Sequence, residues 1–442
     1  MKPKPKRMLL RRDRARFQAE ERAKAQAKER AKPRPRAMTR ERRALATHAG
    51  EVTLHGDHAQ AEPLAAALRA CATAPTEDLT HGFHAHPARM HPVIPAQLIP
   101  LLSKPGDIVL DPFVGGGTVL VEALAHGRRA AGVDLDPLAL RIAETRCQVR
   151  SESERKRFGA VLRAVAAASE ERVRTRTKLD DLPIPREERV FYDPHVMLEL
   201  SGLLAEITSV PQREDRRALE LVFSAIVVKF SRQRADTSEE IVPKRIRKGL
   251  VTEFFLRKGE ELLLRWEALA DAVPSDAQPA RLWLGDARYL TDLLGMRFRA
   301  SLVLTSPPYG GTYDYVRHHA RRHSWLKLDT SELQDREIGA RRNLSRKLGA
   351  RRRWDDELGA ALASIAGVLA PEGRIVFFIG DGELDGERVE ADRQLLRIAP
   401  ERGLAVLAGA SQERPDYRGG SPRREHLILL AHARPERSAD VK

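Results

Sequence analysis

Residues 107–136 constrain the fold more than any other part of this 442-residue chain. The segment reads as a strand, DIVLDPF, then a glycine-rich loop that opens a helix, GGGTVLVEALAHG, and then a second strand, RRAAGVDLDP. Gly127 suits the end of the helix, because glycine readily adopts the left-handed conformation that follows a last helical turn. A strand, a helix and a strand within about 30 residues predict a β-α-β unit, and hence a parallel sheet.

Strand-like runs return in the last part of the chain. Apolar stretches bounded by glycine, proline or polar residues lie at 281–285, 300–309, 373–380 and 425–432. A helical stretch at 355–370 separates two of them. This alternation predicts one α/β sheet, with helices on both faces, that is interrupted by an insertion.

The insertion is predicted to be mainly helical. Residues 151–275 show no strand-helix alternation, and ALELVFSAIVVKF and EFFLRKGEELLLRWEALADAV have helical length with partial 3.6-residue periodicity. Two interpretations stay open, an element that recognises a target and additional core packing. The predicted organisation is a basic arm at 1–50, one sheet half at 51–150, this insertion, and a second sheet half at 276–442.

The net charge of +15 is concentrated in the arm. Residues 1–45 hold 18 Lys+Arg and 5 Asp+Glu, so the remaining chain is nearly neutral. The arm is poor in apolar residues and its basic runs are punctuated by proline, which predicts disorder. A basic arm suits nucleic-acid phosphates, and a solvated arm without a specific partner is the alternative.

Several classes of protein are excluded by composition. No stretch approaches 18 uninterrupted apolar residues, and the N-terminus has no apolar segment typical of a secretory signal, so we expect no membrane association. The only two cysteines, Cys71 and Cys147, exclude a disulfide framework and a cysteine-based zinc site. A reducing, cytoplasmic location is therefore expected. No sequence feature indicates an oligomeric state.

The glycine loop carries acids rather than phosphate-binding residues. It lacks both the third glycine of GxGxxG and the Gly-Lys-Ser/Thr of a P-loop. Asp111 ends the first strand and Asp134 ends the second, where ligands of open α/β sheets bind. One carboxylate suits an ammonium group and the other suits two ribose hydroxyls. A ligand with both features and no phosphate is S-adenosylmethionine (AdoMet).

DPFVGGGTVLVEA followed by GVDLDP resembles the cofactor half of AdoMet-dependent methyltransferases that act on exocyclic amino groups, which have a Rossmann-like sheet. The His/Pro-rich stretch at 81–99 resembles the segment that closes over the cofactor in this family. Its histidines lack an adjacent acid or cysteine that would complete a metal site, so no metal is expected. The resemblance implies the following cofactor-binding residues: Asp111, Phe113, Gly115 and Gly117 at the methionine end, Asp134 at the ribose, Asp286 at the adenine amino group, and also Thr118.

Thr305-Ser306-Pro307-Pro308-Tyr309 ends an apolar strand. Two successive prolines cannot continue a central strand, so the chain turns here with fixed φ. An exocyclic amino nitrogen is a poor nucleophile because its lone pair is delocalised into the ring. The Ser306 hydroxyl and the Pro307 carbonyl can each accept a hydrogen bond from one N–H of the amino group, which localises the lone pair on the nitrogen. Tyr309 offers a ring face on which an extruded base can stack.

This stretch resembles the Asp/Asn/Ser-Pro-Pro-aromatic motif of amino-group DNA methyltransferases, which implies that Ser306, Pro307, Pro308 and Tyr309 are catalytic. The serine form is commoner among N4-cytosine enzymes, so the implied substrate is DNA and the implied target is N4 of cytosine. N6-adenine DNA methylation, RNA methylation such as at guanine N2 of tRNA, and a nucleic-acid-binding protein without catalysis stay open. Carbon-5 methylation is disfavoured because neither cysteine follows a proline.

Basic stretches provide candidate nucleic-acid surfaces. Residues 317–353 hold 12 Lys+Arg and 4 Asp+Glu. Four aromatic residues lie within or beside them: Tyr313, Tyr315, Trp325 and Trp354. Cations suit phosphates and aromatic rings suit bases, with a solvated helical face as the alternative. Residues 231–249 form a second candidate, but their mixed charge favours a solvated face.

Overall fold

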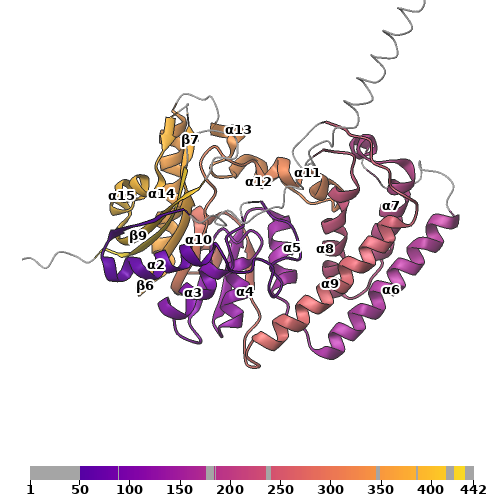
Figure 1. Ribbon diagram of the computed structural model, residues 1–442, viewed down its shortest axis with the longest axis horizontal. Coiled ribbons are helices and arrows are strands. Elements are labelled where there is room, and N and C mark those ends of the chain that lie inside the picture. The colour runs from indigo at the N-terminus through magenta and orange to yellow at the C-terminus, as the bar shows by residue number, and fades with distance from the viewer. Residues whose placement is uncertain are drawn as a thin grey trace, which may run out of the picture. The chain divides into compact units, whose positions relative to one another are not determined.

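The computed structural model describes residues 50–433, apart from 88, 176–183, 185, 235–239, 345–348, 385–386 and 415–422 (Figure 1). All of them belong to one folding unit. The predicted basic arm lies outside the described residues, except for Gly50 at its end. Within the described part of the chain, no helix is long and apolar enough to span a membrane.

A single sheet of eight strands organises the described residues. Its order across the sheet is β1 (Val52–Gly56), β9 (Leu404–Arg414), β10 (Arg423–His432), β6 (Leu369–Gly380), β5 (Ala300–Thr305), β2 (Ile108–Asp111), β3 (Arg129–Asp134) and β4 (Arg281–Leu284). The strands from β6 to β4 are parallel, β10 is antiparallel to both β6 and β9, and β1 is antiparallel to β9. The carboxyl ends of β2, β3, β4 and β5 therefore meet at one edge of the sheet.

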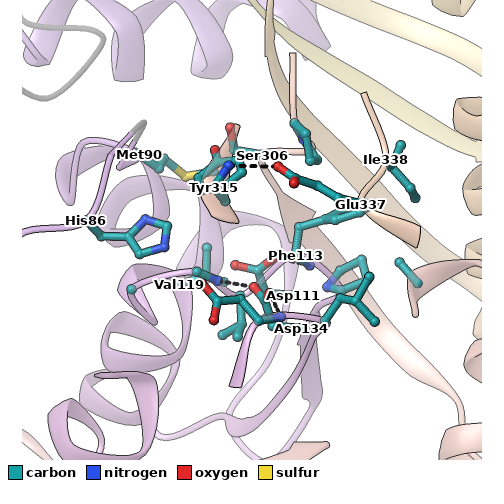
Figure 2. Close-up of a pocket in the computed structure, with 18 of the residues that line it drawn as sticks. His86, Met90, Asp111, Phe113, Val119, Asp134, Ser306, Tyr315, Glu337 and Ile338 are labelled. Atoms are coloured by element: carbon teal, nitrogen blue, oxygen red, sulfur yellow. Dashed lines mark hydrogen bonds between the residues drawn. The ribbon is translucent and has the colours of Figure 1, made fainter. Parts of the chain in front are cut away.

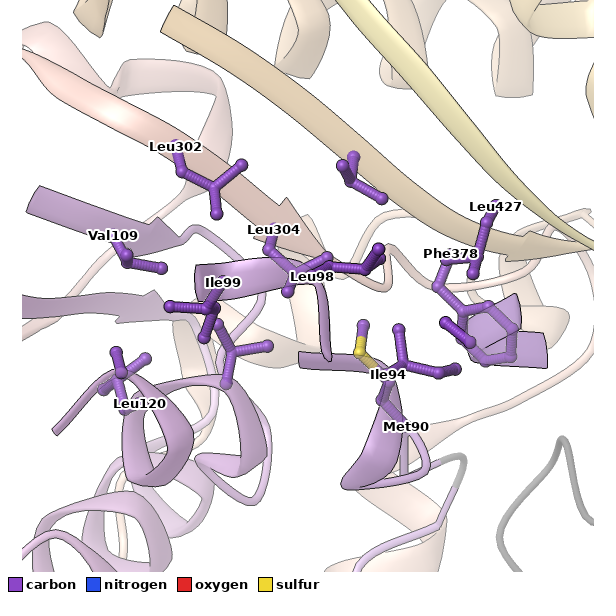
Figure 3. Close-up of a cluster of buried hydrophobic side chains, with 14 of the residues drawn as sticks. Met90, Ile94, Leu98, Ile99, Val109, Leu120, Leu302, Leu304, Phe378 and Leu427 are labelled. Atoms are coloured by element: carbon purple, nitrogen blue, oxygen red, sulfur yellow. The ribbon is translucent and has the colours of Figure 1, made fainter. Parts of the chain in front are cut away.

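Alternate residues of the strands pack on opposite faces, as the pleat of a strand requires. On β6, Val376 and Phe378 join one buried cluster, whereas Ile375, Phe377 and Ile379 join another. Figure 3 shows the first cluster, in which Phe378 lies beside Leu427 and Ile94. Because both faces are covered, the central strands read as nearly continuous apolar runs.

Two groups of helices provide these clusters. The first cluster takes side chains from α2 (His58–Ala70), α3 (Val93–Leu102) and α4 (Thr118–Ala125). The second takes side chains from α10 (Leu290–Leu294), α14 (Ala350–Val368) and α15 (Ala391–Ile398). The predicted fold class, a Rossmann-like α/β sheet with helices on both faces, is confirmed.

Residues 151–275 contain four long helices with a core of their own. They are α6 (Glu152–Thr175), α7 (Pro194–Thr208), α8 (Arg213–Phe230) and α9 (Leu250–Ala272), together with the short 3-10 helix η1 (Arg186–Phe191). Their cluster also includes Leu138 and Ile142 from α5 (Pro137–Arg146) and Trp325 from α11 (Tyr315–Trp325). The insertion is thereby attached to the sheet through α5 and α11.

The remaining elements connect or flank the sheet. They are η2 (Ala287–Tyr289), α12 (Ser331–Arg336), α13 (Arg341–Leu344), the hairpin β7 (Gly382–Leu384) and β8 (Glu387–Val389), and η3 (Pro400–Arg402). Strands β1, β9, β7 and β8 were not predicted. The helix predicted at 355–370 ends at Val368, because Leu369 already pairs with Ala300 on β5.

Candidate active site

Asp111 and Thr305 join the ends of two neighbouring strands. The Thr305 hydroxyl donates a hydrogen bond to Asp111 Oδ1 at 2.5 Å, and the Phe113 N–H donates to the same oxygen at 3.1 Å. Burial of the carboxyl raises its pKa to about 7, although both hydrogen bonds oppose that rise. Thr305 directly precedes Ser306, so this bond connects the glycine loop to the Ser-Pro-Pro-Tyr turn.

The glycine loop closes because Gly117 adopts a left-handed conformation at the start of α4. Its φ is 77°, and a Cβ there would lie 2.9 Å from Ala143 on α5. A residue with a side chain would be strained at this position and would also displace α5. The loop before it is tied to β3, because the Gly115 N–H donates to Asp134 Oδ2 at 2.8 Å.

Two acids follow β3, and sequence reasoning identified only the first of them. Asp134 also accepts from the Asp136 N–H at 2.9 Å, and burial together with the Asp136 charge raises its pKa to about 7. Asp136 begins α5 by accepting from the Leu138 N–H at 2.8 Å, and the same oxygen contacts His323 Nε2 at 2.9 Å. Its other oxygen is buried without a hydrogen-bond partner among the described residues.

Asp286 follows β4 and lies at the same edge of the sheet. It begins η2 by accepting from the Arg288 N–H at 2.9 Å, and it forms an ion pair with the Arg288 guanidinium at 2.6 Å. The two side-chain oxygens are thus already held by Arg288, which fixes their orientation.

One cavity lies between these strand ends. Of the predicted site residues, it is lined by Asp111, Phe113, Gly115, Thr118, Asp134, Asp286, Ser306 and Pro308. The Thr118 hydroxyl and Asp136 Oδ2 are both buried at this cavity without partners in the described structure. An unpartnered buried hydroxyl and carboxylate oxygen favour a polar ligand there. Figure 2 shows Asp111 and Asp134 on one side of the cavity and Ser306 on the other.

Three predicted residues do not line the cavity, namely Gly117, Pro307 and Tyr309. Gly117 acts through the turn that it permits. Tyr309 is 2% exposed, and its ring packs against Gly380 at the end of β6 and within the cluster of α14. Its proposed role in base stacking stays a prediction.

Two covers that are far apart in sequence close the cavity. His86, Arg89 and Met90 come from the His/Pro-rich stretch (Figure 2). Tyr315, Leu333, Glu337 and Ile338 come from the segment after the Ser-Pro-Pro-Tyr turn. The Tyr315 ring stacks on His86 with ring centroids 5.8 Å apart, and the Glu337 carboxylate accepts from the Tyr315 N–H at 2.8 Å. Sequence reasoning assigned no role to Leu333, Glu337 or Ile338, because no local pattern shows that this long connection folds back over the glycine loop.

The histidines of the first cover have separate surroundings. His81 contacts Glu122 at 2.6 Å, His84 contacts the Ser224 hydroxyl at 3.0 Å, and burial lowers the pKa of His86 to about 4. Among the described residues, the one group close enough together to hold a metal is Asp381, Asp392 and His426, which does not line the cavity. Asp381 and His426 already contact each other at 3.0 Å.

The basic segment 317–353 does not behave as one surface. Trp325 and Trp354 are each 2% exposed and belong to two different cores, so they are not available to bases. Tyr315 lines the cavity and Tyr313 lies beside it, with ring centroids 5.8 Å apart. Of the four aromatic residues expected to contact nucleic acid, the two tryptophans therefore pack in hydrophobic cores, and the two tyrosines lie at or beside the cavity.

Comparison with known proteins supports this assembly of features. Residues 10–145 match the N6/N4 methyltransferase family described as DNA methylase. The chain is 46% identical over 67 residues to the Type II methyltransferase M.MvaI of Kocuria varians, which is 14% of this chain and 15% of that protein. It is 38% identical over 68 residues to the Type II methyltransferase M2.DpnII of Streptococcus pneumoniae, which is 15% of this chain and 25% of that protein. The matches thus span a quarter or less of these relatives.

Solved structures resemble the chain more distantly. The match to the rRNA methyltransferase AviRa of Streptomyces viridochromogenes covers 82% of this chain and 94% of the AviRa chain, with a TM-score of 0.34 and 12% identity. The match to TrmN of Thermus thermophilus covers 78% of this chain and 49% of TrmN, with a TM-score of 0.29 and 14% identity. Scores at this level say nothing about substrate.

The strand order, with antiparallel β10 beside β6, and the acids that surround one cavity at the strand ends define a Rossmann-like α/β fold with an acid-lined cavity at the carboxyl ends of its parallel strands. Within less than half of the chain, residues 10–145, the sequence is similar to DNA methylases of the N6-adenine and N4-cytosine type.

Proposed function

We propose that this protein transfers a methyl group from AdoMet to the exocyclic amino group of an extruded base in DNA, with N4 of cytosine as the target. The observation that carries the proposal is the position of Ser306 and Pro308 in the wall of the acid-lined cavity. The family match and the Type II methyltransferase relatives support DNA as the substrate. The serine in place of aspartate favours cytosine over adenine.

The cavity residues fit the cofactor, which supplies an electrophilic methyl group when bound. Asp111 is the carboxylate proposed for the ammonium group, Asp134 for the ribose hydroxyls and Asp286 for the adenine amino group. Thr118 adds a hydroxyl that lacks a partner among the described residues. His86 is held neutral by burial, so it adds no positive charge beside a sulfonium.

The Ser306 hydroxyl and the Pro307 carbonyl each accept a hydrogen bond from one N–H of the amino group, and together they direct its lone pair at the methyl carbon. The amino nitrogen would form its bond to the methyl carbon as that carbon separates from the sulfonium sulfur, which would leave as a neutral thioether, and the nitrogen would then release one proton to solvent. The Thr305–Asp111 hydrogen bond fixes the strand end on which this turn begins. Positioning of this kind removes the entropic cost of orienting the two reactants.

The test is incubation of the protein with methyl-labelled AdoMet and either DNA or total tRNA, followed by digestion to nucleosides and mass analysis. Label in N4-methylcytosine of DNA is expected. N6-methyladenine in DNA would keep the reaction class and reject the cytosine assignment. Label only in tRNA would reject DNA as the substrate.

Ser306→Ala is the matched variant. We expect it to lower the rate by about 100-fold or more, because one of two preorganised acceptors is lost, while AdoMet binding measured by calorimetry is retained. Full activity in a folded Ser306→Ala protein would remove Ser306 from the mechanism.

A further inference from the structure

One end of the helical insertion, formed by η1 and the end of α8, lies beside α11, the first helix after the Ser-Pro-Pro-Tyr turn. On α11, Arg321 contacts Glu188 of η1 at 2.8 Å and lies over the Phe191 ring at 3.7 Å. At the end of α8, the Arg232 N–H donates to the Phe191 carbonyl at 2.6 Å. η1 is therefore held between α11 and the end of α8. We call residues 240–249, which follow this end of α8, together with Arg317 and Arg321 of α11, the insertion edge.

Residues 240–249 are fixed in place although they form no helix. The Val242 N–H donates to the Arg232 carbonyl at 2.8 Å, and His195 Nε2 contacts the Ile246 carbonyl at 2.8 Å. The buried Glu199 carboxylate accepts from the Gly249 N–H at 2.7 Å and holds the start of α9. A surface whose backbone is already ordered loses little entropy when a partner binds.

The insertion edge has more cationic side chains than are held by carbonyl or carboxylate partners within it. Lys244 donates to the carbonyls of Lys229 and Ser231, and Arg247 pairs with Glu253. Arg245 and Lys248 are exposed, and neither forms an ion pair with another described residue. On the other side of η1, α11 contains no acid at all. Clustered cations repel one another, and a bound polyanion relieves that repulsion.

The insertion edge adjoins the cavity through α11. Tyr315, the first residue of α11, lines the cavity, and an 11-residue helix extends about 16 Å from that point. Single phosphates of a DNA strand are spaced by about 3.4 Å along the duplex axis, so a few nucleotides span this distance.

We propose that the insertion edge binds the sugar-phosphate backbone of double-stranded DNA next to the target base. This inference rests on the proposed function, since it takes DNA as the substrate. The inference identifies the part of the insertion that contacts the substrate. The insertion edge includes residues 240–249, for which the mixed charge of 231–249 favoured a solvated face when only the sequence was considered.

The test uses the full chain with Arg245→Ala and Lys248→Ala combined. Binding to a short DNA duplex is measured between about 50 and 200 mM salt. We expect affinity to fall by about tenfold and the slope of log affinity against log salt to become shallower by about 1.8, because each lost phosphate contact contributes about 0.9. AdoMet affinity and the rate at saturating DNA should stay unchanged.

The control removes two exposed cations from the opposite end of the insertion, by Lys156→Ala and Arg213→Ala. That end is identified by Asp215 near the start of α8, which contacts Arg157 near the start of α6 at 3.1 Å. The control should bind DNA as the wild type does.

Equal losses in both double variants would overturn the proposal, since only net charge would then matter. Unchanged DNA binding by Arg245→Ala/Lys248→Ala would also overturn it. If the wild-type protein bound RNA but not duplex DNA, the proposed function would be rejected together with this inference. If the wild-type protein methylated DNA while Arg245→Ala/Lys248→Ala bound DNA normally, only this inference would fail.

Discussion

The ionisation of Asp111 depends on its burial and on two hydrogen bonds, one of them from the Thr305 hydroxyl. Burial raises its pKa to about 7, and the hydrogen bond from Thr305 holds that value lower than burial alone would. The carboxyl is therefore mostly neutral at pH 6 and mostly anionic at pH 8. Only the anion pairs with an ammonium group, so binding of the methionine end of AdoMet should follow this titration.

We expect AdoMet affinity to rise by about tenfold between pH 6 and pH 8, following the anionic fraction of a group with this pKa. Thr305→Val removes the opposing hydrogen bond, so the midpoint of the rise should move to higher pH. Asp111→Asn should bind weakly and with a much flatter pH profile. Calorimetry across this range measures all three, and a Thr305→Val profile identical to that of the wild type would refute the coupling.

The acids of the cavity could be predicted from sequence because each directly follows a strand. The orientation of Tyr309 could not be predicted, because it depends on a contact with β6, which is some 70 residues further along the chain. The same reason explains why Tyr315 and Glu337 were not assigned to the cavity. Local patterns locate strand ends, whereas side-chain direction in a long connection is set by tertiary contacts.

At the scale of elements, the end of β6 supports the Ser-Pro-Pro-Tyr turn. A Cβ on Gly380 would lie 2.6 Å from Tyr309 Cε2. The next residue, Asp381, accepts hydrogen bonds from the Ala391 and Arg424 N–H groups, both at 3.1 Å, and contacts His426 at 3.0 Å. These bonds, together with Arg388, hold the pKa of Asp381 well below its usual range. The strand end therefore cannot move easily to accommodate a larger residue.

Gly380→Ala should displace the Tyr309 ring and with it the Ser306 turn. A displacement near 1 Å at reacting groups lowers rates by up to about 100-fold, so we expect kcat to fall while AdoMet affinity is retained. Gly159→Ala on α6 is the control, because its added methyl group meets only side-chain ends, Leu263 at 3.3 Å and Arg163 at 3.6 Å. Steady-state kinetics decides the matter, and an unaffected kcat in Gly380→Ala would show that the turn does not depend on β6.

The buried Arg146 at the end of α5 links the first cover to the glycine loop. Its guanidinium donates to the Gly116 carbonyl at 2.7 Å and to the carbonyls of His81 and His84 at 2.7 and 2.6 Å. No carboxylate forms an ion pair with it among the described residues, and burial lowers its pKa to about 9. Three carbonyls on two segments thus share one cation.

Arg146→Lys keeps the charge but cannot reach all three carbonyls. We expect AdoMet affinity to fall by about tenfold, the cost of losing one or two hydrogen bonds to a charged group. Arg129→Lys is the control, because Arg129 is exposed and donates from its side chain to the single carbonyl of Gly106 at 2.8 Å. Equal AdoMet affinity in the wild type and Arg146→Lys would argue against a role in positioning the cover.

The sheet was predictable from its centre to the β4 edge, but not at the opposite edge, where β1 and β9 lie. Strands β2, β3, β5 and β6 are apolar runs bounded by turn residues, and all were expected. β1 and β9 were missed because VTLHG and LAVLAGASQER mix small and polar residues with apolar ones. Pairing between them depends on positions some 350 residues apart, which no local pattern encodes.

For the whole molecule, the two cavity acids make stability depend on pH. Asp111 and Asp134 have pKa values of about 7 in the folded protein, against about 4 in an unfolded chain. Between these values the folded state binds more protons than the unfolded state, so stability falls as pH rises. This contribution is fully present below about pH 4 and is lost by about pH 8.

We therefore expect the Tm of the protein without AdoMet to fall from pH 6 to pH 8, measured by calorimetry at constant ionic strength. Asp111→Asn should show a smaller fall, because one of the two titrating groups is gone. Saturating AdoMet should also reduce the fall, since its ammonium group stabilises the anionic form of Asp111. A Tm that rises over this range in the wild type but not in Asp111→Asn would reverse the assignment.

The two covers of the cavity have a consequence for synthesis of the chain. The glycine loop leaves the ribosome early, but the cavity also needs Tyr315 and Ile338, which are made after the whole insertion. At about 5–20 residues per second, the loop is exposed for ten seconds or more before those residues appear. During that interval the nascent chain has Asp111 and Asp134, but it lacks Asp286 and the walls that would retain the cofactor. Cofactor binding therefore belongs to the finished protein, and AdoMet cannot assist the earliest folding of the β-α-β unit that is completed first.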